Sequence, residues 1–285
     1  MHSKVIACVD PRSPLMSLCD GAAWAANKLS APILLLQVLE RHPEAAQHLD
    51  ATGQIGLGAQ ESLLQELAQL DQRRCALAQE QGRQILVGMR DRALAAGVID
   101  VERLQRHGEL SETVSELEGA GLMLVMGRQD HRLLAGRALD HHIERVLRAT
   151  HKPVLVIVGP DFVAPTSFVL AYDGSDTAAK LLGHVASNRL LQGLRCHLVQ
   201  ADKRSVANEA SLSRAGERLR QAGFEFTTSL EEGDVGTVLS RAIARHGAGL
   251  LVMGANGHSR LRQLVLGSTT AQLLRGSSVP VLVAT

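Results

Sequence analysis

The amino-acid sequence predicts an α/β fold made of two similar units, each a five-stranded parallel sheet with helices on both faces. Short apolar runs alternate with helical stretches along the chain. These runs are continuously apolar, which is typical of strands covered on both faces. The order of elements in the second part of the chain repeats the order in the first. Alternation with short connections favours a parallel, doubly wound sheet.

The repeat is visible as a direct alignment. Residues 127–153 lie over residues 254–280 without a gap. Near the start of each unit, residues 5–10 (VIACVD) match residues 168–173 (FVLAYD). One structural unit therefore occurs twice.

This duplication predicts two domains, residues 1–158 and residues 167–285, joined by a short linker at 159–166. The linker contains a Gly-Pro step, which favours a loop. A chain of 285 residues is long enough for two ordinary domains.

In the second unit, apolar runs rich in β-branched residues predict the strands, and helical stretches separate them. The predicted strands are 168–172, 196–201, 224–229, 250–253 and 279–283, and the predicted helices are 177–191, 208–222, 235–246 and 268–274. Asp173, Gln200 and Gly254 stand at the carboxyl ends of three of these strands. Because ligands of such sheets bind beyond those ends, the three residues are expected to converge on one site.

The first unit follows the same plan with one enlargement. Its second helix is predicted over 61–96 and is rich in Gln, Leu, Arg and Ala. The polar, glycine-containing stretch 42–58 precedes it. We interpret this stretch as an insertion without a ligand role, and a mobile lid is the alternative.

Composition narrows the function and the location. A formal net charge of +1 and an aromatic content of 2% argue against a nucleic-acid partner. No apolar run reaches the length of a membrane span, and the first residues do not have the pattern of a signal peptide, so a cytoplasmic protein is expected.

The four cysteines form no CxxC pair, and we expect free thiols, with oxidant sensing as an open alternative. They are Cys8, Cys19, Cys75 and Cys196.

A glycine-rich motif in the second unit predicts a phosphate-binding cradle. Its pattern is Gly254-x2-Gly257-x9-Gly267-Ser268-Thr269, between a strand and a helix. Glycines let the backbone approach an anion, and a helix start offers free N–H groups and a positive dipole end. The motif lacks the lysine of a Walker loop. The alternative is an ordinary loop whose helix is capped by Ser268 or Thr269.

This motif resembles the signature of ATP-binding universal stress protein domains, Gly-x2-Gly-x9-Gly-Ser/Thr after the fourth strand. Asp173 matches the aspartate that the family carries after its first strand. The likeness covers nearly the whole chain as two copies. The chain therefore resembles a tandem universal stress protein, which implies two Rossmann-like, adenine nucleotide alpha hydrolase-like domains.

The resemblance also implies the ligands and the residues that hold them. It implies ATP, with Mg²⁺, and a role in the stress response. The implied binding residues are Ala171, Tyr172, Asp173 and Gln200 around adenine and ribose, Met253 and Gly254 at the ribose and α-phosphate, and Gly257, His258, Gly267, Ser268 and Thr269 at the phosphates. Asp173 would lie near the ribose or the divalent cation. Gln200 replaces the family's small apolar residue, which is harmless if only its backbone is used.

The first unit departs from the signature. The residues at the positions of Gly257, Gly267, Ser268 and Thr269 are Asp130, Asp140, His141 and His142. Carboxylates at a phosphate site repel the ligand, so we predict that this unit does not bind ATP in the same way, although Asp10 is retained. Capping and solvated surface explain these residues. A metal site is the sharper alternative, which adjacent histidines disfavour.

We interpret the protein as a nucleotide binder without catalytic residues, because the cradle holds no lysine. Two alternatives stay open: a slow ATPase that uses Asp173, His258 and loop arginines, and a module for another ligand or partner. The last strands of the two units, 153–158 and 279–283, are apolar and could pair edge to edge. That pairing would give an internal pseudo-dimer, and two chains could associate further as a homodimer.

Overall fold

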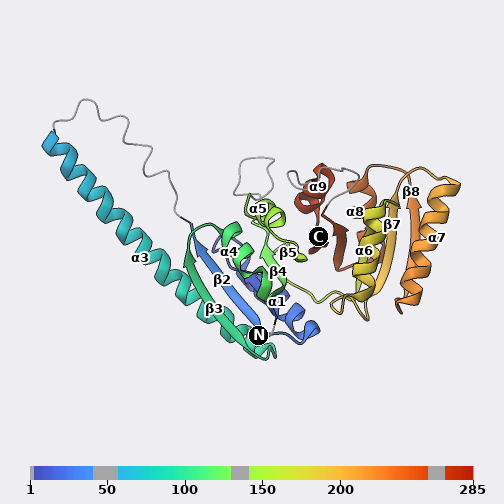
Figure 1. Ribbon diagram of the computed structural model, residues 1–285, viewed down its shortest axis with the longest axis horizontal. Coiled ribbons are helices and arrows are strands. Elements are labelled where there is room, and N and C mark those ends of the chain that lie inside the picture. Colours follow the sequence, from blue (N-terminus) through green and yellow to red (C-terminus); the bar gives the residue numbers. More distant parts are fainter. Residues whose placement is uncertain (1–2, 41–56, 130–140, 256–266, 285) are drawn as a thin grey trace.

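The computed structural model describes residues 3–40, 57–129, 141–255 and 267–284. Ten strands of these ranges form one sheet in the order β3-β2-β1-β4-β5-β10-β9-β6-β7-β8 (Figure 1). The strands are β1 Lys4–Cys8, β2 Ile33–Leu39, β3 Val101–His107, β4 Gly121–Gly127, β5 Val154–Ile157, β6 Ser167–Tyr172, β7 Arg195–Ala201, β8 Phe226–Glu231, β9 Leu250–Gly254 and β10 Val281–Ala284. The helices are α1 Leu15–Leu29, α3 Leu57–Ala95, α4 Leu110–Leu117, α5 His141–Ala149, α6 Asp176–Ser187, α7 Val206–Gln221, α8 Val235–His246 and α9 Ser268–Gly276, with a short 3₁₀ turn at Glu118–Ala120.

Each half of the sheet is parallel. The pairs β1–β2, β1–β4, β2–β3 and β4–β5 are parallel, and so are β6–β7, β6–β9, β7–β8 and β9–β10. The two halves meet in one antiparallel pair, β5–β10, in which Leu155 lies opposite Leu282. The predicted fold class, two five-stranded parallel sheets with helices on both faces, is confirmed.

Two apolar cores cover the two faces of the sheet, and each runs through both halves. Side chains of α1, α3, α6 and α7 pack on one face, with Leu18, Leu86, Leu182 and Leu219 among their buried residues. Side chains of α4, α5, α8 and α9 pack on the other face. Successive strand residues alternate between these cores, because side chains of a strand point to opposite faces. The continuous apolar runs of the sequence have this origin.

Several predicted bounds in the second half differ from the structure by two residues or more, and two of them have a clear structural reason. The helix predicted over 177–191 ends at Ser187, and Asn188 begins a turn in which its side-chain oxygen accepts a hydrogen bond from the Leu190 amide at 3.0 Å. The strand predicted from residue 224 begins at Phe226. Gly223 has a φ of 82° and ends α7, and the Phe224 amide donates to the Leu219 carbonyl at 3.0 Å. Phe224 is therefore a core residue of the helix-ending turn.

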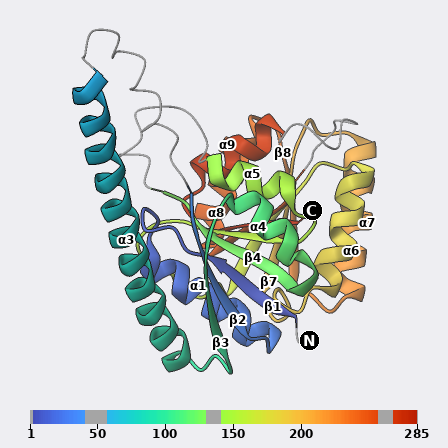
Figure 2. The ribbon, with the colours of Figure 1, turned by 60° about the vertical axis from the view of Figure 1, so that its left-hand side comes forward.

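The long helix α3 packs on the sheet only with its carboxyl-terminal part. The helix comes close to the sheet near residue 80, where the Gln79 carbonyl accepts a hydrogen bond from Gln105 Nε2 at 3.0 Å and a Cβ added to Gly82 would lie 1.9 Å from the Gln37 Oε1 atom. The preceding part projects away from the sheet (Figure 2). Of the described residues, no helix is both long and apolar enough to span a membrane. Of the stretch 42–58, interpreted as an insertion, residues 42–56 lie outside the described residues, and residues 57–58 belong to α3.

Candidate functional site

The predicted site residues of the second half gather where the strand order reverses. Strand β6 lies between β7 and β9, and its helix α6 packs on one face while α9, which follows β9, packs on the other. Tyr172 pairs with Gln200, and Leu170 with Val252, so the strands end level with one another. We call this edge, where β6, β7 and β9 end, the carboxyl edge. It is the position at which open α/β sheets bind ligands.

Asp173 is held in a tight turn at this edge. Its Oδ1 atom accepts hydrogen bonds from the Ser175 amide at 3.0 Å and from the Ser175 hydroxyl at 2.6 Å. Gly174 has a φ of 74°, a left-handed conformation that glycine adopts without strain. Ser175 caps α6 by accepting a hydrogen bond from the Ala178 amide at 3.1 Å. The carboxylate is therefore fixed by the first turn of α6 and is half-buried.

The side chains of Ala171, Tyr172 and Met253 belong to the two cores. Tyr172 is 8% exposed, and its hydroxyl lies 3.1 Å from the Ser211 hydroxyl on α7. Met253 is 3% exposed on the opposite face. A ligand at the carboxyl edge would meet mainly backbone groups here, as the family resemblance implies.

Gln200 carries an unsatisfied amide. The residue is 0% exposed, and neither its Oε1 nor its Nε2 atom has a hydrogen-bond partner in the described part of the chain. A Cβ built on Gly174 would lie 3.6 Å from Nε2, so the amide lies beside the turn that carries Asp173. A buried group without a partner costs about 1–3 kcal/mol. We expect a ligand or a water molecule to form the missing hydrogen bonds of the Gln200 amide.

The first half contains the same glutamine with a partner. Gln37 occupies the equivalent position on β2 and is 1% exposed. Its Oε1 atom accepts a hydrogen bond from Gln105 Nε2 at 2.9 Å. The strand register places Gln105 opposite Gln37, and it places Leu230 opposite Gln200. The missing partner is thus specific to the second half. Our sequence interpretation, which considered only the Gln200 backbone, did not identify this amide, although the repeat alignment contained the signal.

The start of α9 lacks a side-chain cap. Gly267 is the N-cap residue, and no side chain of the described residues bonds the first amides. The other three described helices of the second half are capped by Ser175, Ser205 and Asp234. Capping of α9 by Ser268 or Thr269, the alternative raised by the sequence, is therefore not what the structure contains. Uncapped amides at a helix start form a favourable site for an anion.

Helix α9 is tied to the end of β9 by a buried threonine. Thr270 is 5% exposed, and its hydroxyl donates a hydrogen bond to the Ala255 carbonyl at 3.1 Å. Ser268 and Thr269 are exposed at the helix start. Gly254, at the end of β9, and Gly267, at the start of α9, therefore lie on either side of the contact that joins these two elements. Gly257 and His258 lie outside the described residues.

At the equivalent edge of the first half, side chains hydrogen-bond to one another. Arg12, at the position of Ser175, donates from Nη2 to Asp10 Oδ2 at 3.0 Å, and Gln129 Nε2 donates to the same oxygen at 2.8 Å. His142 lies 3.0 Å from Arg12 Nη2 through its Nε2 atom and 3.4 Å from Glu40 Oε1 through its Nδ1 atom. Burial alone would raise the pKa of Asp10, but the hydrogen bonds from Arg12 and Gln129 outweigh it and hold this pKa below its usual value.

The histidines of the first half do not face one site. His141 is exposed, whereas His142 is half-buried in the network with Arg12. Within the described ranges, no three histidine, cysteine or acidic residues are grouped as a metal would require. Asp130 and Asp140 lie outside the described residues.

Three of the four thiols are buried. Burial raises the pKa of Cys8 to about 12 and that of Cys19 to about 11, and it raises the pKa of Cys196 as well. These thiols stay protonated and unreactive near neutral pH. Cys75 is exposed on α3 and is the one described thiol that an oxidant can reach.

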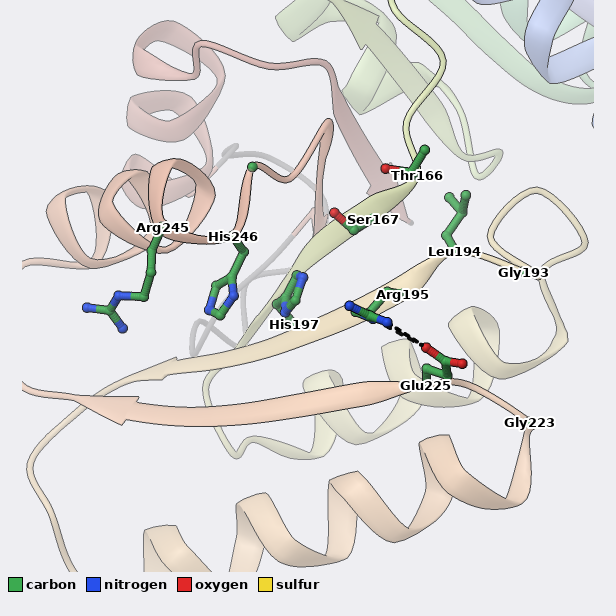
Figure 3. A pocket seen from close by; sticks show the side chains of 11 residues that line it. Thr166, Ser167, Gly193, Leu194, Arg195, His197, Gly223, Glu225, Arg245 and His246 are labelled. Atoms are coloured by element: carbon green, nitrogen blue, oxygen red, sulfur yellow. Dashed lines mark hydrogen bonds and ion pairs between the residues drawn. The ribbon is translucent and has the colours of Figure 1, made fainter.

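A hollow lies at the edge of the sheet opposite the carboxyl edge, where β6, β7 and β8 begin (Figure 3). It is an open depression of about 740 Å³. Its lining includes Arg195, His197, Glu225, Arg245 and His246. The rings of His197 and His246 stack with centroids 3.9 Å apart. No motif in the sequence predicts this hollow.

The stacked histidines predict an acid-sensitive contact. Burial, followed by His246 and Arg195, lowers the pKa of His197, whose Nδ1 atom lies 2.8 Å from the Thr227 hydroxyl. The unfolded chain then binds a proton more readily than the folded one, so stability falls as the pH drops through the unfolded value of about 6.5. We expect the melting temperature to fall between about pH 7.5 and pH 5.5, and the fall to be smaller in His197→Gln.

Calorimetric melts at the two pH values test this expectation. His184→Gln, at an exposed histidine of α6, is the matched control and should keep the wild-type pH dependence. An unchanged pH dependence in His197→Gln would show that the stacked pair is not the sensitive group.

Comparisons with known proteins agree with this architecture. The model of the universal stress protein family matches residues 1–158 and 197–285. A universal stress protein of Synechocystis sp. is 33% identical over 283 residues, which cover 98% of each chain. A universal stress protein from Archaeoglobus fulgidus has the same fold, with a TM-score of 0.73, 18% identity and coverage of 100% of this chain and 99% of that one. A protein of unknown function from Pseudomonas aeruginosa has a TM-score of 0.64, 17% identity and coverage of 99% and 92%. The chain therefore belongs to the universal stress protein family.

Proposed function

We propose that the second half binds ATP at the carboxyl edge and that the protein acts in the stress response through this binding. The observation that carries the proposal is the combination of two unsatisfied features at this edge. The uncapped start of α9 favours an anion, and the buried amide of Gln200 requires a hydrogen-bonding partner. Strands β9 and β7 flank β6, so both features border the carboxyl edge, with the Gln200 amide on the face covered by α6 and α7 and the start of α9 on the other face. A nucleotide is long enough to reach both.

The chemistry of each group fits a part of the nucleotide. The amides of Ser268 and Thr269, with Gly267 and the flanking Gly257 and His258, would hold the phosphates. The Gln200 carboxamide offers one acceptor and one donor side by side, and adenine presents the complementary pair on its edge. Backbone groups of Ala171, Tyr172, Met253 and Gly254 would border adenine and ribose.

Asp173 would lie at the ribose or at a Mg²⁺ ion that accompanies ATP. Mg²⁺ prefers carboxylate and phosphate oxygens, and it would offset the charge of the phosphates. The Asp173 carboxylate is already oriented by Ser175, so binding would require little rearrangement of this side chain.

We propose that the first half does not bind ATP. Arg12 engages the Asp10 carboxylate there, and His142 stands where the second half has Thr269. The halves, residues 1–158 and 167–285 with a linker at 159–166, would act as a pseudo-dimer of one binding and one non-binding domain.

Calorimetric titration of the full chain with Mg²⁺ and ATP tests the proposal. We expect saturable binding of one ATP per chain, and release of ATP from freshly purified, denatured protein in a mass spectrum. A folded protein with no binding heat, no thermal shift and no retained nucleotide would contradict the proposal and favour another ligand or partner.

Gln200→Leu should separate stability from binding. Without ligand, the variant should melt at a temperature equal to or above that of the wild type, because an unsatisfied amide that costs about 1–3 kcal/mol is removed. Its affinity for ATP should fall about tenfold, and its preference for ATP over GTP should shrink. Titrations with both nucleotides measure these effects.

Gln37→Leu is the matched control in the first half. It should lower the melting temperature, because Gln105 Nε2 loses its hydrogen bond to Gln37 and keeps only the one to the Gln79 carbonyl, and it should leave the affinity for ATP unchanged. Equal effects of the two substitutions on ATP binding would contradict the role assigned to Gln200.

A further inference from the structure

The amino-terminal part of α3 forms an arm whose residues 65–81 are exposed, with the Gln79 carbonyl, which accepts a hydrogen bond from Gln105 Nε2 at 3.0 Å, as its contact with the sheet. We call residues 57–81 the α3 arm. Residues 65–81 are all exposed, whereas Leu86, Met89 and Ala93, nearer the end of the helix, are buried against the sheet. Figures 1 and 2 both show the arm projecting from the body of the protein. Most of the stability of a protein helix comes from the packing of an amphipathic face, so a partner surface would stabilise the arm.

The arm presents its own apolar stripe. Leu67, Leu70 and Leu77 are 40%, 58% and 72% exposed. Their spacing, with Arg74 between them, is that of the a and d positions of a heptad repeat. At 3.6 residues per turn, the stripe lies about 110° around the helix from the face that packs on the sheet. It is therefore not a continuation of the core-facing side.

Two opposite charges flank the stripe on the same side. Glu66 and Arg73 lie one heptad apart, and neither makes an ion pair with another described residue. In an antiparallel pair of identical helices, such flanking positions face each other across the seam. Glu66 of one copy would then face Arg73 of the second copy, and the pair would occur twice by symmetry.

We propose that the α3 arm binds the α3 arm of a second copy of this chain as an antiparallel pair. In this register, Leu67 packs on Leu70 of the second copy, and the two-fold axis passes between residues 68 and 69. The overlap then runs from residue 57 to residue 80. It covers the whole arm and stops just before Gly82, where the helix meets its own sheet.

The charges disfavour the other registers. A shift of one heptad would place Glu66 against Glu80 and Arg73 against the same arginine of the second copy. A parallel pair would place Glu66 against Asp71. Like charges at these positions oppose pairing.

Sedimentation velocity of the full chain over a range of concentrations tests the proposal. We expect a monomer–dimer equilibrium that Leu67→Glu/Leu70→Glu shifts to the monomer, with the dissociation constant raised about 100-fold. Gln72→Glu, on the opposite side of the same helix, is the matched control and should dimerise like the wild type. At a concentration at which the wild type is monomeric, both variants should melt at the wild-type temperature, because these side chains are exposed.

A charge-reversal cycle tests the register. Glu66→Arg and Arg73→Glu should each raise the dissociation constant about fivefold, and the double variant should restore it. A monomeric wild type would overturn the proposal and indicate that the arm binds a different partner. A dimer that survives Leu67→Glu/Leu70→Glu would also overturn it, because another surface would then hold the copies together. A double variant that fails to restore dimerisation would overturn the antiparallel register.

Discussion

Gly267→Asp should abolish ATP binding without destabilising the protein. The substitution is sterically allowed, because the Gly267 φ of −56° suits any residue and an added Cβ would lie 3.6 Å from its nearest neighbour, the Thr270 hydroxyl oxygen. Aspartate is a preferred N-cap residue, so its carboxylate should accept hydrogen bonds from the free amides of α9. The same carboxylate would occupy the phosphate position and repel the ligand. We expect the affinity for ATP to fall at least about 100-fold, the scale of losing a charge-assisted anion site.

Gly267→Asn separates the effect of a negative charge from the effect of a side chain that fills the phosphate position. Asparagine caps a helix about as well as aspartate but carries no charge, so its loss of affinity should be smaller. Titration with Mg²⁺ and ATP measures binding, and thermal melts without ligand measure stability. An aspartate variant that binds ATP like the wild type would show that the start of α9 does not hold the phosphates.

Gly267→Asp should lower the affinity for ATP but not the stability of the protein. This combination distinguishes a binding site from a structural loop. A loop selected for stability would gain from a cap, as α6, α7 and α8 do from Ser175, Ser205 and Asp234. The first half has Asp140 at the position of Gly267. Under our proposal, this position contributes to the difference between a binding half and a non-binding half, together with the Arg12–Asp10 contact and His142.

The sequence was sufficient for the fold because its local signals agree with one another. The apolar runs at β6, β7 and β9 are buried on both faces, and Ser175, Ser205 and Asp234 mark the starts of three helices. The two misplaced bounds, at Ser187 and Phe226, fall where an apolar residue is buried outside the element that its pattern suggested. Leu190 and Phe224 are core residues in turns, and a pattern of apolar residues cannot distinguish a buried turn from the end of a helix or the start of a strand.

The candidate site was predictable as a location but not in its contacts. The glycine motif and Asp173 identified the carboxyl edge, because topology alone brings strand ends together. The partner of Gln37 and the absence of one at Gln200 depend on which residue of the next strand lies opposite, Gln105 or Leu230. The contact of Arg12 with Asp10 depends on a side-chain conformation. Neither strand register nor side-chain conformation can be read from spacing in one sequence.

Leu155→Ala and Leu282→Ala should each produce a large loss of stability. The side chains are 0% and 1% exposed and lie opposite each other in the antiparallel pair that joins the halves. Each truncation should lower the free energy of unfolding by about 2–5 kcal/mol, because it leaves a cavity in a closely packed core. Urea unfolding of the full chain measures this loss.

The double variant tests whether the halves pair in solution. Residues in contact share a cavity, so the combined loss should differ from the sum of the single losses by about 0.5–3 kcal/mol. Leu155→Ala with Leu198→Ala is the matched control. Leu198 is equally buried on the same face but lies in β7, several strands away, so these losses should add.

Additive losses at Leu155 and Leu282, with two separate unfolding transitions, would mean that the halves fold independently and are held only by the linker. Coupled losses would mean that each half closes the open edge of the other. In that case the half without the nucleotide signature has a physical reason to be retained. Apolar edge strands such as β5 and β10 are exposed to aggregation when unpaired. Under our proposal, the half that does not bind ATP would still shield β10 of the half that does.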